Sequence, residues 1–275
     1  MMNMMNILFL GDSHGKWQSF ENKIITHNLQ DVNIIHLGDG AFGFCKYRKE
    51  DQYIVERLNN FCASRNIILY NVQGNHDHPF WFKSESALIK YFKNEDSKVS
   101  SLMKNDFYYK SLYLDPTDFA KFIKNLSNVK FLINYDIINI DGLNILPVGG
   151  ATSIDRLYQQ TQSNYFTDEK VVYSNKIKKL SNVDIVVSHT CPDFVSPRTF
   201  APLVYQYAKQ DKNLIYELTQ ERKLMTKIYK DLIKKNNIRC WFFGHYHHHI
   251  EEKFDNCTFR CFAPLELFEM NFDLF

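Results

Sequence analysis

Five short motifs of this sequence combine residue types that bind metal ions in proteins, and each follows an apolar stretch. In chain order they contribute Asp12 and His14 of GDSH, Asp39 of GD, Asn75 and His76 of GNH, His189 of SH, and His245 and His247 of GHYH. Carboxylate, imidazole and amide oxygen together suit borderline divalent metals such as Mn, Fe, Zn or Ni. The motifs therefore predict a metal centre.

The spacing within the motifs favours a centre with two ions. Asp12 and His14 are two residues apart at the end of an extended segment, so both side chains can face one ion. Asp39 is a lone carboxylate after a central strand, where it is placed to bridge two ions. The glycines beside these residues let the backbone approach a tightly packed site. Two ions roughly 3.5 Å apart that share a hydroxide are the usual arrangement for in-line attack on phosphorus.

The five motifs, from Asp12 to His247, resemble those of the calcineurin-like metallophosphoesterase superfamily, in the same order. The resemblance places the first metal on Asp12, His14 and His247, and the second on Asn75, His189 and His245. It implies that Asp39 bridges the two metals and that His76 is the catalytic histidine, which assists the leaving oxygen beside the phosphate. The fold that it implies is an α/β protein, an αββα four-layer sandwich with the metals at the edge loops of the sheets.

The second motif departs from the pattern of the protein Ser/Thr phosphatases in this superfamily. Those enzymes carry GDxxDRG, which supplies an Asp partner for the catalytic histidine and an Arg that binds phosphate. Residues 38–44 read GDGAFGF instead, so protein phosphatase activity is less expected and the partner of His76 is left open. The second histidine of GHxH is typical of the diesterase and small-substrate branches.

A further segment, GGATSIDR at residues 149–156, is similar to one in small bacterial and phage members of the superfamily. It follows a predicted hairpin, from which it can reach the metal centre. We therefore take Arg156 as a candidate contact to the substrate phosphate.

Short apolar runs that alternate with amphipathic stretches predict helices packed on a sheet. Residues 6–10, 33–37 and 67–71 are expected to form buried strands, with a helix between the last two. Ligands collect at the loops that leave the carboxyl ends of such strands. Residues 80 to about 128 are rich in Phe, Tyr, Lys and Asn and are interpreted as an insertion or cap.

The second half of the chain continues this alternation. We expect a hairpin over residues 136–146 with an Asp141-Gly142 turn, a strand at 183–188, a helix over 213–236, and strands at 238–243, near 250 and at 258–262. Because no repeat or linker is visible, residues 1–275 are predicted to form a single metallophosphoesterase domain that carries the insertion.

The composition is that of an ordinary soluble globular protein, with 275 residues of which 45% are hydrophobic and 23% charged. A net charge of +2 argues against a strong nucleic-acid footprint. No apolar run approaches the roughly 20 residues of a membrane helix, so no membrane partner is expected. The start lacks the features of a signal peptide and the six cysteines form no CxxC pair, which favours free thiols and a cytoplasmic location.

The motif residues also have ordinary structural explanations. Asp12, Asp39 and Asn75 could cap helices, and His189 could be a core histidine, but neither role explains several histidines at matching strand ends. We expect His248 to lie opposite His247, in packing or at the surface. His36 and His78 are expected to make local hydrogen bonds or core contacts, and the aromatic 80–128 segment to extend the core, with a lid as the alternative.

The predicted function is a dinuclear metal-dependent hydrolase of phosphoesters, a phosphatase or phosphodiesterase that uses a metal-bridging hydroxide. Two divalent ions are the expected cofactors, manganese first, with iron, zinc or nickel as alternatives. The expected partner is a small phosphoester or a nucleotide-type substrate, and the ligand set is compatible with monoesters and diesters alike. A nuclease on DNA or RNA is the alternative enzyme, and a non-catalytic scaffold of the same fold is the less favoured alternative. No oligomeric state is predicted.

Overall fold

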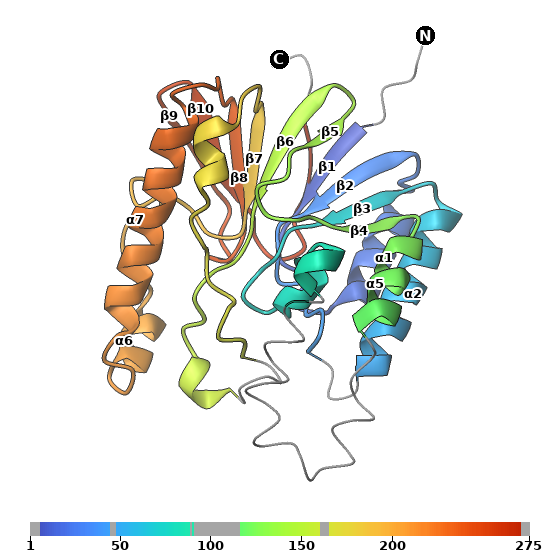
Figure 1. Ribbon diagram of the computed structural model, residues 1–275, viewed down its shortest axis with the longest axis horizontal. Helices are drawn as coiled ribbons and strands as arrows, with labels where there is room; N and C mark the ends of the chain where they lie inside the picture. Colours follow the sequence, from blue (N-terminus) through green and yellow to red (C-terminus); the bar gives the residue numbers. More distant parts are fainter. Residues whose placement is uncertain (1–5, 45–47, 89, 91–115, 160–164, 271–275) are drawn as a thin grey trace.

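Four layers of secondary structure make up the described part of the chain, which in this computed structural model comprises residues 6–44, 48–88, 90, 116–159 and 165–270. Figure 1 shows two sheets face to face between layers of helices. The helices α1 (Trp17–Thr26), α2 (Arg48–Ser64) and α5 (Pro116–Asn125) cover one sheet, and α7 (Leu214–Leu232) covers the other, with α6 (Pro202–Ala208) beside it. The predicted αββα sandwich is therefore confirmed.

The first sheet has the strand order β11-β1-β2-β3-β4. Its strands are β1 (Asn6–Leu10), β2 (Val32–His36), β3 (Ile68–Asn71), β4 (Val129–Phe131) and β11 (Leu267–Glu269). Strands β1 to β4 are parallel, with Phe9 opposite Ile35 in the register, whereas β11 pairs antiparallel with β1. The loops that follow β1, β2 and β3 consequently leave the same edge of the sheet.

The second sheet has the order β5-β6-β7-β8-β10-β9. Its strands are β5 (Ile138–Ile140), β6 (Leu143–Val148), β7 (Ile185–Ser188), β8 (Cys240–Phe243), β9 (Ile250–Phe254) and β10 (Cys257–Cys261). The predicted hairpin is confirmed, because Ile140 pairs antiparallel with Leu143 across the Asp141-Gly142 turn. Strands β6, β7 and β8 are parallel, so the loops after β7 and β8 also share one edge.

Both faces of the central strands are buried, which explains their unbroken apolar runs. In β1, Ile7 and Phe9 point between the two sheets, and the Phe9 ring lies 4.3 Å from that of Phe242. Leu8 and Leu10 point the other way, into the core under the helices. Side chains alternate along a strand, so this one short segment contributes to two cores.

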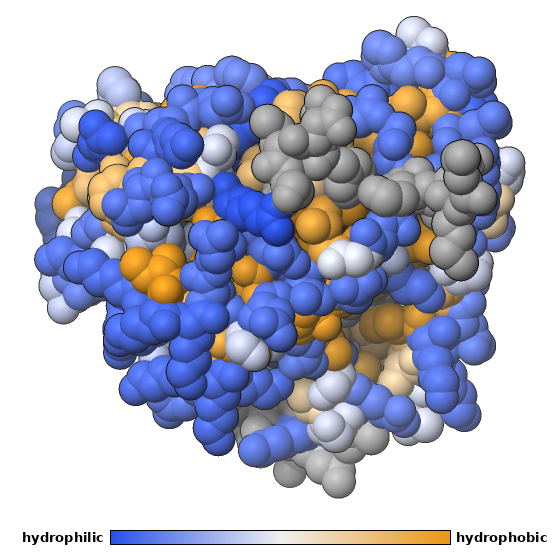
Figure 2. Space-filling view, turned by 90° about the horizontal axis from the view of Figure 1, so that it is seen from above, coloured by the Kyte–Doolittle hydropathy of each residue, from blue (hydrophilic) through white to orange (hydrophobic). Residues whose placement is uncertain are grey.

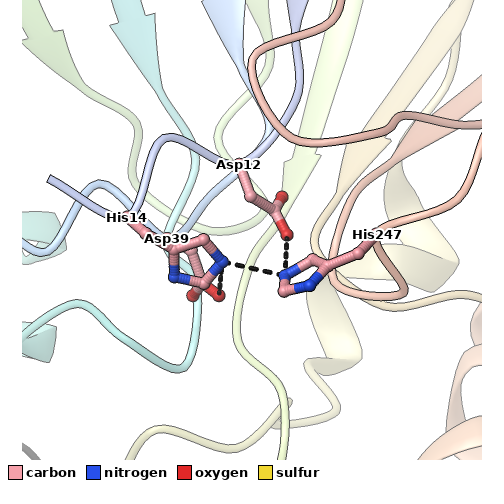
Figure 3. Close-up of side chains that lie close together, drawn as sticks. All are labelled: Asp12, His14, Asp39 and His247. Atoms are coloured by element: carbon pink, nitrogen blue, oxygen red, sulfur yellow. Dashed lines mark hydrogen bonds and ion pairs between the residues drawn. The ribbon is translucent and has the colours of Figure 1, made fainter. Parts of the chain in front are cut away.

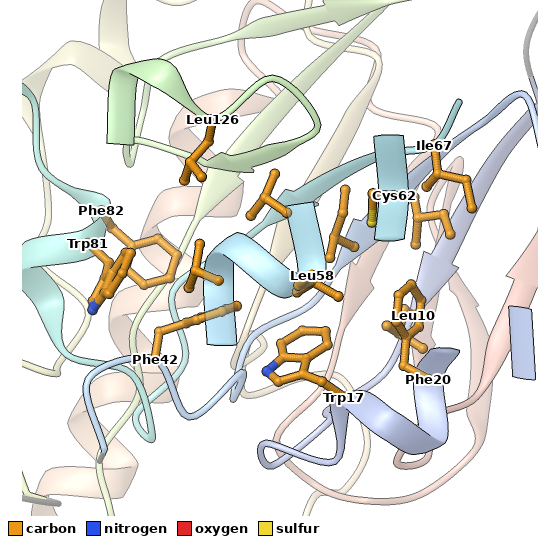
Figure 4. Close-up of a cluster of buried hydrophobic side chains, with 14 of the residues drawn as sticks. Leu10, Trp17, Phe20, Phe42, Leu58, Cys62, Ile67, Trp81, Phe82 and Leu126 are labelled. Carbon is orange, nitrogen blue, oxygen red and sulfur yellow. The ribbon is translucent and has the colours of Figure 1, made fainter. Parts of the chain in front are cut away.

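The described parts of the 80–128 segment belong to the first core. Trp81 and Phe82 of the 3₁₀ helix η1 (Pro79–Phe82) are buried in this core (Figure 4). Phe119 of α5 is buried in the same core. α5 leads directly into β4, which is parallel to β3, so it forms the crossover between two neighbouring strands. In these parts the segment extends the core, as the more favoured interpretation expected, and does not cap the predicted site; residues 91–115 lie outside the described ones.

Two further 3₁₀ helices are η2 (Arg156–Tyr158) and η3 (Asn175–Lys179). Figure 2 shows the face at the top of Figure 1, where polar side chains predominate and apolar ones form small separate groups. Among the described residues, no helix has the length and the apolar character that crossing a membrane requires.

Candidate metal centre

The motif residues of both sheets meet at one place, at the carboxyl ends of the parallel strands. A first group consists of side chains from the loops after β1, β2 and β8, namely Asp12, His14, Asp39 and His247 (Figure 3). A second group consists of Asp39, His189 and His245. Within each group the potential ligand atoms lie within 4.8 Å of one another. Asp39 belongs to both groups, which is the position that a bridging carboxylate would occupy.

In the first group the ligand atoms face one another directly. The Nε2 atoms of His14 and His247 are 2.8 Å apart, and His247 Nε2 is 3.3 Å from Asp12 Oδ2. His14 Nε2 is 3.8 Å from Asp39 Oδ2. The side chains thus converge on a single point with two nitrogens and two oxygens, a donor set suited to a borderline divalent metal.

In the second group His189 occupies the centre. Its Nε2 is 3.1 Å from Asp39 Oδ1 and 3.1 Å from Asn75 Oδ1, and its Nδ1 is 2.8 Å from the carbonyl oxygen of Leu37. The Leu37 carbonyl accepts the Nδ1 proton in the neutral tautomer, which leaves Nε2 free to bind a metal. The Asn75 amide oxygen, predicted as a ligand, therefore faces the same point as the histidine.

The buried charges of the centre attract positive charge. Burial alone would lower the pKa of His189, but Asp39 and Asp12 outweigh it and raise this pKa to about 10. Burial would likewise raise the pKa of Asp39, yet the surrounding histidines, His189 first, hold it well below its usual range. Asp12 Oδ1 is buried and has no hydrogen-bond partner among the described residues. A buried carboxylate oxygen without a hydrogen bond is costly, and a bound cation would compensate it, so the residues present fit a divalent metal.

The backbone at the centre has an uncommon conformation. His14, Asp39, His245 and His247 have positive φ angles of 45°, 57°, 69° and 57°. Such conformations in residues other than glycine are uncommon and are enriched at functional sites. Hydrogen bonds hold His14 and Asp39, because the Asp39 side chain accepts from the backbone N–H of His76 at 2.8 Å and its carbonyl accepts from that of His14 at 2.7 Å.

Two glycines permit this close packing, as the sequence predicted. A Cβ atom on Gly74 would collide with Asp39 Oδ1, and one on Gly38 would collide with the His189 ring. Gly38 also has a φ of +105°, which strains any other residue.

His76 lies beside the first group and lines the cavity described below. Its ring is 5.5 Å from that of His14 and 5.4 Å from that of Phe44, measured between centroids. Phe44 stands in the segment where the protein phosphatases carry their DRG residues, so an aromatic edge packs on this histidine. The carboxylate that follows His76 in sequence, Asp77, points elsewhere and accepts from the backbone N–H groups of Gly74 and Phe42 at 2.8 and 3.1 Å.

The GGATSIDR segment contacts the centre through a residue that sequence reasoning missed. Ser153 Oγ accepts from Asn75 Nδ2 at 3.1 Å and donates to Glu169 Oε2 at 2.9 Å. Glu169 is fully buried, and burial raises its pKa to about 8. This chain of contacts fixes which end of the Asn75 amide faces His189. The only sequence signal was the similarity of the segment as a whole.

Arg156, the predicted phosphate contact, is directed away from the centre. Its Nε donates to Asp211 Oδ2 at 2.5 Å and its Nη1 donates to Glu217 Oε2. These contacts hold the guanidinium against the loop before α7 and the first turn of that helix. Arg156 is not among the described residues that line the cavity, whereas its neighbours Ile154 and Asp155 are.

A cavity of about 570 Å³ opens onto both ligand groups. His14, Asp39, Asn75, His245 and His247 form one end of it, and residues of α6 and α7 form the other. His248, expected in packing or at the surface, is exposed and contributes to the cavity lining. His78 makes the local contact that was predicted, since its Nδ1 accepts from the backbone N–H of Phe80 at 3.3 Å.

A family model described as calcineurin-like phosphoesterase matches residues 5–249 of this sequence. The match covers most of the chain, so the chain belongs to the calcineurin-like phosphoesterase family. Together with the αββα fold and the metal-ligand groups, this membership identifies the protein as a metallophosphoesterase.

Several known proteins are similar to this chain. The trans-activating transcriptional regulatory protein of Choristoneura fumiferana nuclear polyhedrosis virus is 21% identical over 185 residues, which are 66% of this chain and 29% of that protein. The chain thus spans less than a third of that curated relative's length.

Similar solved structures include a phosphopantetheinyl hydrolase from Mycobacterium tuberculosis, with 13% identity, a TM-score of 0.44 and coverage of 95% of this chain and 91% of that one. A dimetal phosphatase from Danio rerio has 11% identity and a TM-score of 0.43, with coverage of 95% and 88%. A novel archaeal phosphodiesterase has 11% identity and a TM-score of 0.36, with coverage of 97% and 99%.

Proposed function

We propose that this metallophosphoesterase is a dinuclear metal-dependent hydrolase of small or nucleotide-type phosphoesters. In this proposal the first metal is bound by Asp12, His14 and His247, the second by Asn75, His189 and His245, and both by Asp39. The observation that carries the proposal is the membership of Asp39 in two adjacent groups of potential ligand atoms.

The chain's own residues supply the rest of the reaction site. When bound, two divalent ions would provide a nucleophilic hydroxide at neutral pH and stabilise the negative charge that develops on the phosphoryl group. Asp39 holds the two ligand groups at a fixed separation, because its carboxylate oxygens face His14 and His189. His76, at the cavity end of the first group, is placed to donate a proton or hydrogen bond to the leaving oxygen.

The surroundings of the site favour a small substrate over a nucleic acid. Arg222 is the only Lys or Arg among the described residues that line the cavity. Long polynucleotides are bound mainly through many Lys and Arg contacts to phosphates, and such contacts do not surround this site. The nuclease alternative is therefore the less favoured one. Protein phosphatase activity is also disfavoured, because residues 42–44 read FGF where the protein phosphatases carry DRG.

The location that we propose is the cytoplasm. The described cysteines Cys62, Cys191, Cys240, Cys257 and Cys261 are free thiols. Burial raises the pKa of Cys62 and that of Cys191 to about 12, so both are inert thiols that pack as small apolar groups. Free thiols of this kind fit a reducing compartment.

The proposal is tested by hydrolysis of p-nitrophenyl phosphate beside bis-p-nitrophenyl phosphate, with manganese added and then replaced by iron, zinc or nickel. Wild-type protein should turn over one ester only when metal is present, and the preferred ester distinguishes a phosphatase from a diesterase. His76→Ala should keep its metal and lose about 10²- to 10⁴-fold in turnover.

The matched control is His27→Ala, since His27 is an exposed histidine that follows α1 and lies outside both groups. It should behave as wild type. Absence of both turnover and bound metal in the wild-type protein would contradict the proposal and favour the non-catalytic scaffold. Equal turnover in His76→Ala and wild type would remove His76 from the reaction.

A further inference from the structure

The cavity beside the metal-ligand groups has an apolar far wall. We define this apolar wall as Ile154, Phe200, Leu203, Val204, Tyr207 and Leu218, all of which line the cavity. Leu203 is 48% exposed, although it is a leucine in a short helix whose neighbour Val204 is buried. An exposed leucine at the wall of a cavity offers apolar area that a bound molecule can cover.

The apolar wall packs on a small hydrophobic core that is separate from the main ones. Val204 packs with Leu214 and Leu218 in a separate small core, against which Ile154, Phe200 and Tyr207 lie. Arg222 of α7 holds the loop of residues 192–197, which precedes α6 in the chain. Its Nη atoms donate to the carbonyl oxygens of Pro192, Val195 and Pro197. The wall therefore has a fixed position relative to the ligand groups.

The charged residues around the cavity disfavour a second anionic group on the substrate. The Nη atoms of Arg222, the single cationic Arg or Lys among the described lining residues, are used by those loop carbonyls. Two acidic residues, Asp155 and Glu221, line the same cavity. The far end of the cavity thus has one buried guanidinium whose Nη atoms are already engaged and whose Nε is buried, so an anion there would find no free Lys or Arg donor among the described lining residues.

We propose that the cavity selects a phosphoester whose single phosphate group lies at the metal-ligand groups and whose organic part is apolar, uncharged at its far end, and packs on the apolar wall. This inference rests on the proposed function, for which it names the substrate class. A volume of about 570 Å³ is within the range of pockets that bind small organic ligands. The selection acts through the apolar wall, and the phosphate is common to all substrates.

Binding of phosphonates to manganese-loaded protein tests this inference without any turnover. Phosphonates keep the charge of a phosphate group and are not hydrolysed. Isothermal titration calorimetry compares methylphosphonate, hexylphosphonate and 6-phosphonohexanoate, which has a similar chain with a carboxylate at its far end. We expect hexylphosphonate to bind at least about tenfold more tightly than methylphosphonate, and the distal carboxylate to cancel that gain.

Variants of α6 locate the effect. Leu203→Ala should weaken hexylphosphonate about three- to tenfold and leave methylphosphonate unchanged, because only the longer chain reaches the wall. Leu203→Arg should instead improve the binding of 6-phosphonohexanoate, since it places a cation where the distal carboxylate lies. The matched control is Gln206→Ala, an exposed residue of the same helix that does not line the cavity and should change nothing.

Equal affinity for the methyl and hexyl compounds, or no binding of either, would overturn the inference. So would a loss of hexylphosphonate affinity in Gln206→Ala as large as that in Leu203→Ala. The outcomes also separate the inference from the proposed hydrolase. Selective binding without turnover of either nitrophenyl ester would contradict only the hydrolase, whereas turnover with unselective binding would contradict only the inference.

Discussion

The ligand groups lie on loops that directly follow strands of two sheets, whereas the apolar wall opposite them belongs to α6, the start of α7 and one residue of the 149–156 segment. At the ligand end, four residues have positive φ, and Asp39 accepts hydrogen bonds there from the backbone N–H groups of His14 and His76. At the wall end, a seven-residue helix packs on a small core of its own. In the two proposals the chemistry thus depends on the loops of the sheets, and selectivity depends on an element that can vary without moving a proposed ligand.

The largest effect is expected from the residue that joins the two ligand groups. Asp39→Asn removes the charge that both groups share while preserving the shape of the side chain. We expect loss of bound metal and a fall in turnover on the order of 10³-fold or more, because charge stabilisation by metal is a major part of such catalysis. Metal content by mass spectrometry and hydrolysis of the preferred nitrophenyl ester measure both effects.

Gln206→Ala, at an exposed residue of α6 that does not line the cavity, is the control for that experiment. It should leave metal content and the hydrolysis of the preferred nitrophenyl ester near those of wild type. If Asp39→Asn retained two metals and activity, the bridging role would be ruled out and the division between the two ends would lose its basis.

The strands behind the proposed ligands could be predicted from the sequence much better than the elements of the wall. Each ligand is beside its strand in the sequence, and β1, β2 and β3 begin and end within one residue of the expected positions. By contrast β4 and β11 have three residues each, and α6 has seven, so no periodic pattern could establish them. β4 was not expected from the sequence, and its parallel pairing with β3 makes α5 a crossover helix. The insertion at residues 80–128 stays a prediction.

Arg156 illustrates what local sequence does not contain. The similarity of the 149–156 segment to that of related proteins was a reason to expect a contact with the centre, and the contact exists, but through Ser153. The partners of Arg156 are Asp211 and Glu217, far along the chain. Pairing over such separations depends on how α7 packs, and no spacing in the sequence reports it.

A medium effect on metal binding is expected from Ser153, whose hydroxyl contacts the proposed ligand Asn75. Ser153→Ala leaves the Asn75 amide and the Glu169 carboxyl without their shared hydroxyl partner, so the amide loses its orientation. Residues that orient a ligand typically contribute about 10- to 100-fold in metal affinity. We expect weaker binding of one metal of the two, measured by calorimetric titration of manganese into metal-free protein.

Ser19→Ala provides the control for this variant, since Ser19 is an exposed serine of α1 remote from the centre. It should bind both metals as wild type does. Equal loss of both metals in Ser153→Ala would contradict a role confined to Asn75, and would indicate a general disturbance of the site.

The smallest effect is expected from Arg156, which lies outside both the ligand groups and the apolar wall. Its ion pairs contribute to the stability of the fold. Hydrogen bonds from Arg156 lower the pKa of Asp211 and that of Glu217. A carboxyl with a lowered pKa in the folded state stabilises the protein fully above its unfolded pKa near 4, and this stabilisation disappears as the pH falls through the folded value. The side chain of Asp211 is 9% exposed and that of Glu217 29%, so solvent screens the second ion pair more than the first. Arg156→Ala should cost about 1–3 kcal/mol, a fall of a few degrees in Tm at pH 7.

The pH dependence identifies the cause of this difference. The Tm values of wild type and Arg156→Ala should converge as the pH is lowered from about 5 to 3. Protonation of Asp211 and Glu217 removes from the wild type the ion-pair stabilisation that the variant already lacks. Metal binding and turnover of the preferred nitrophenyl ester should not change, since Arg156 lines neither end of the cavity. A large loss of turnover with an unchanged Tm would instead restore Arg156 as a contact to the substrate phosphate, and would place part of the selectivity on the 149–156 segment.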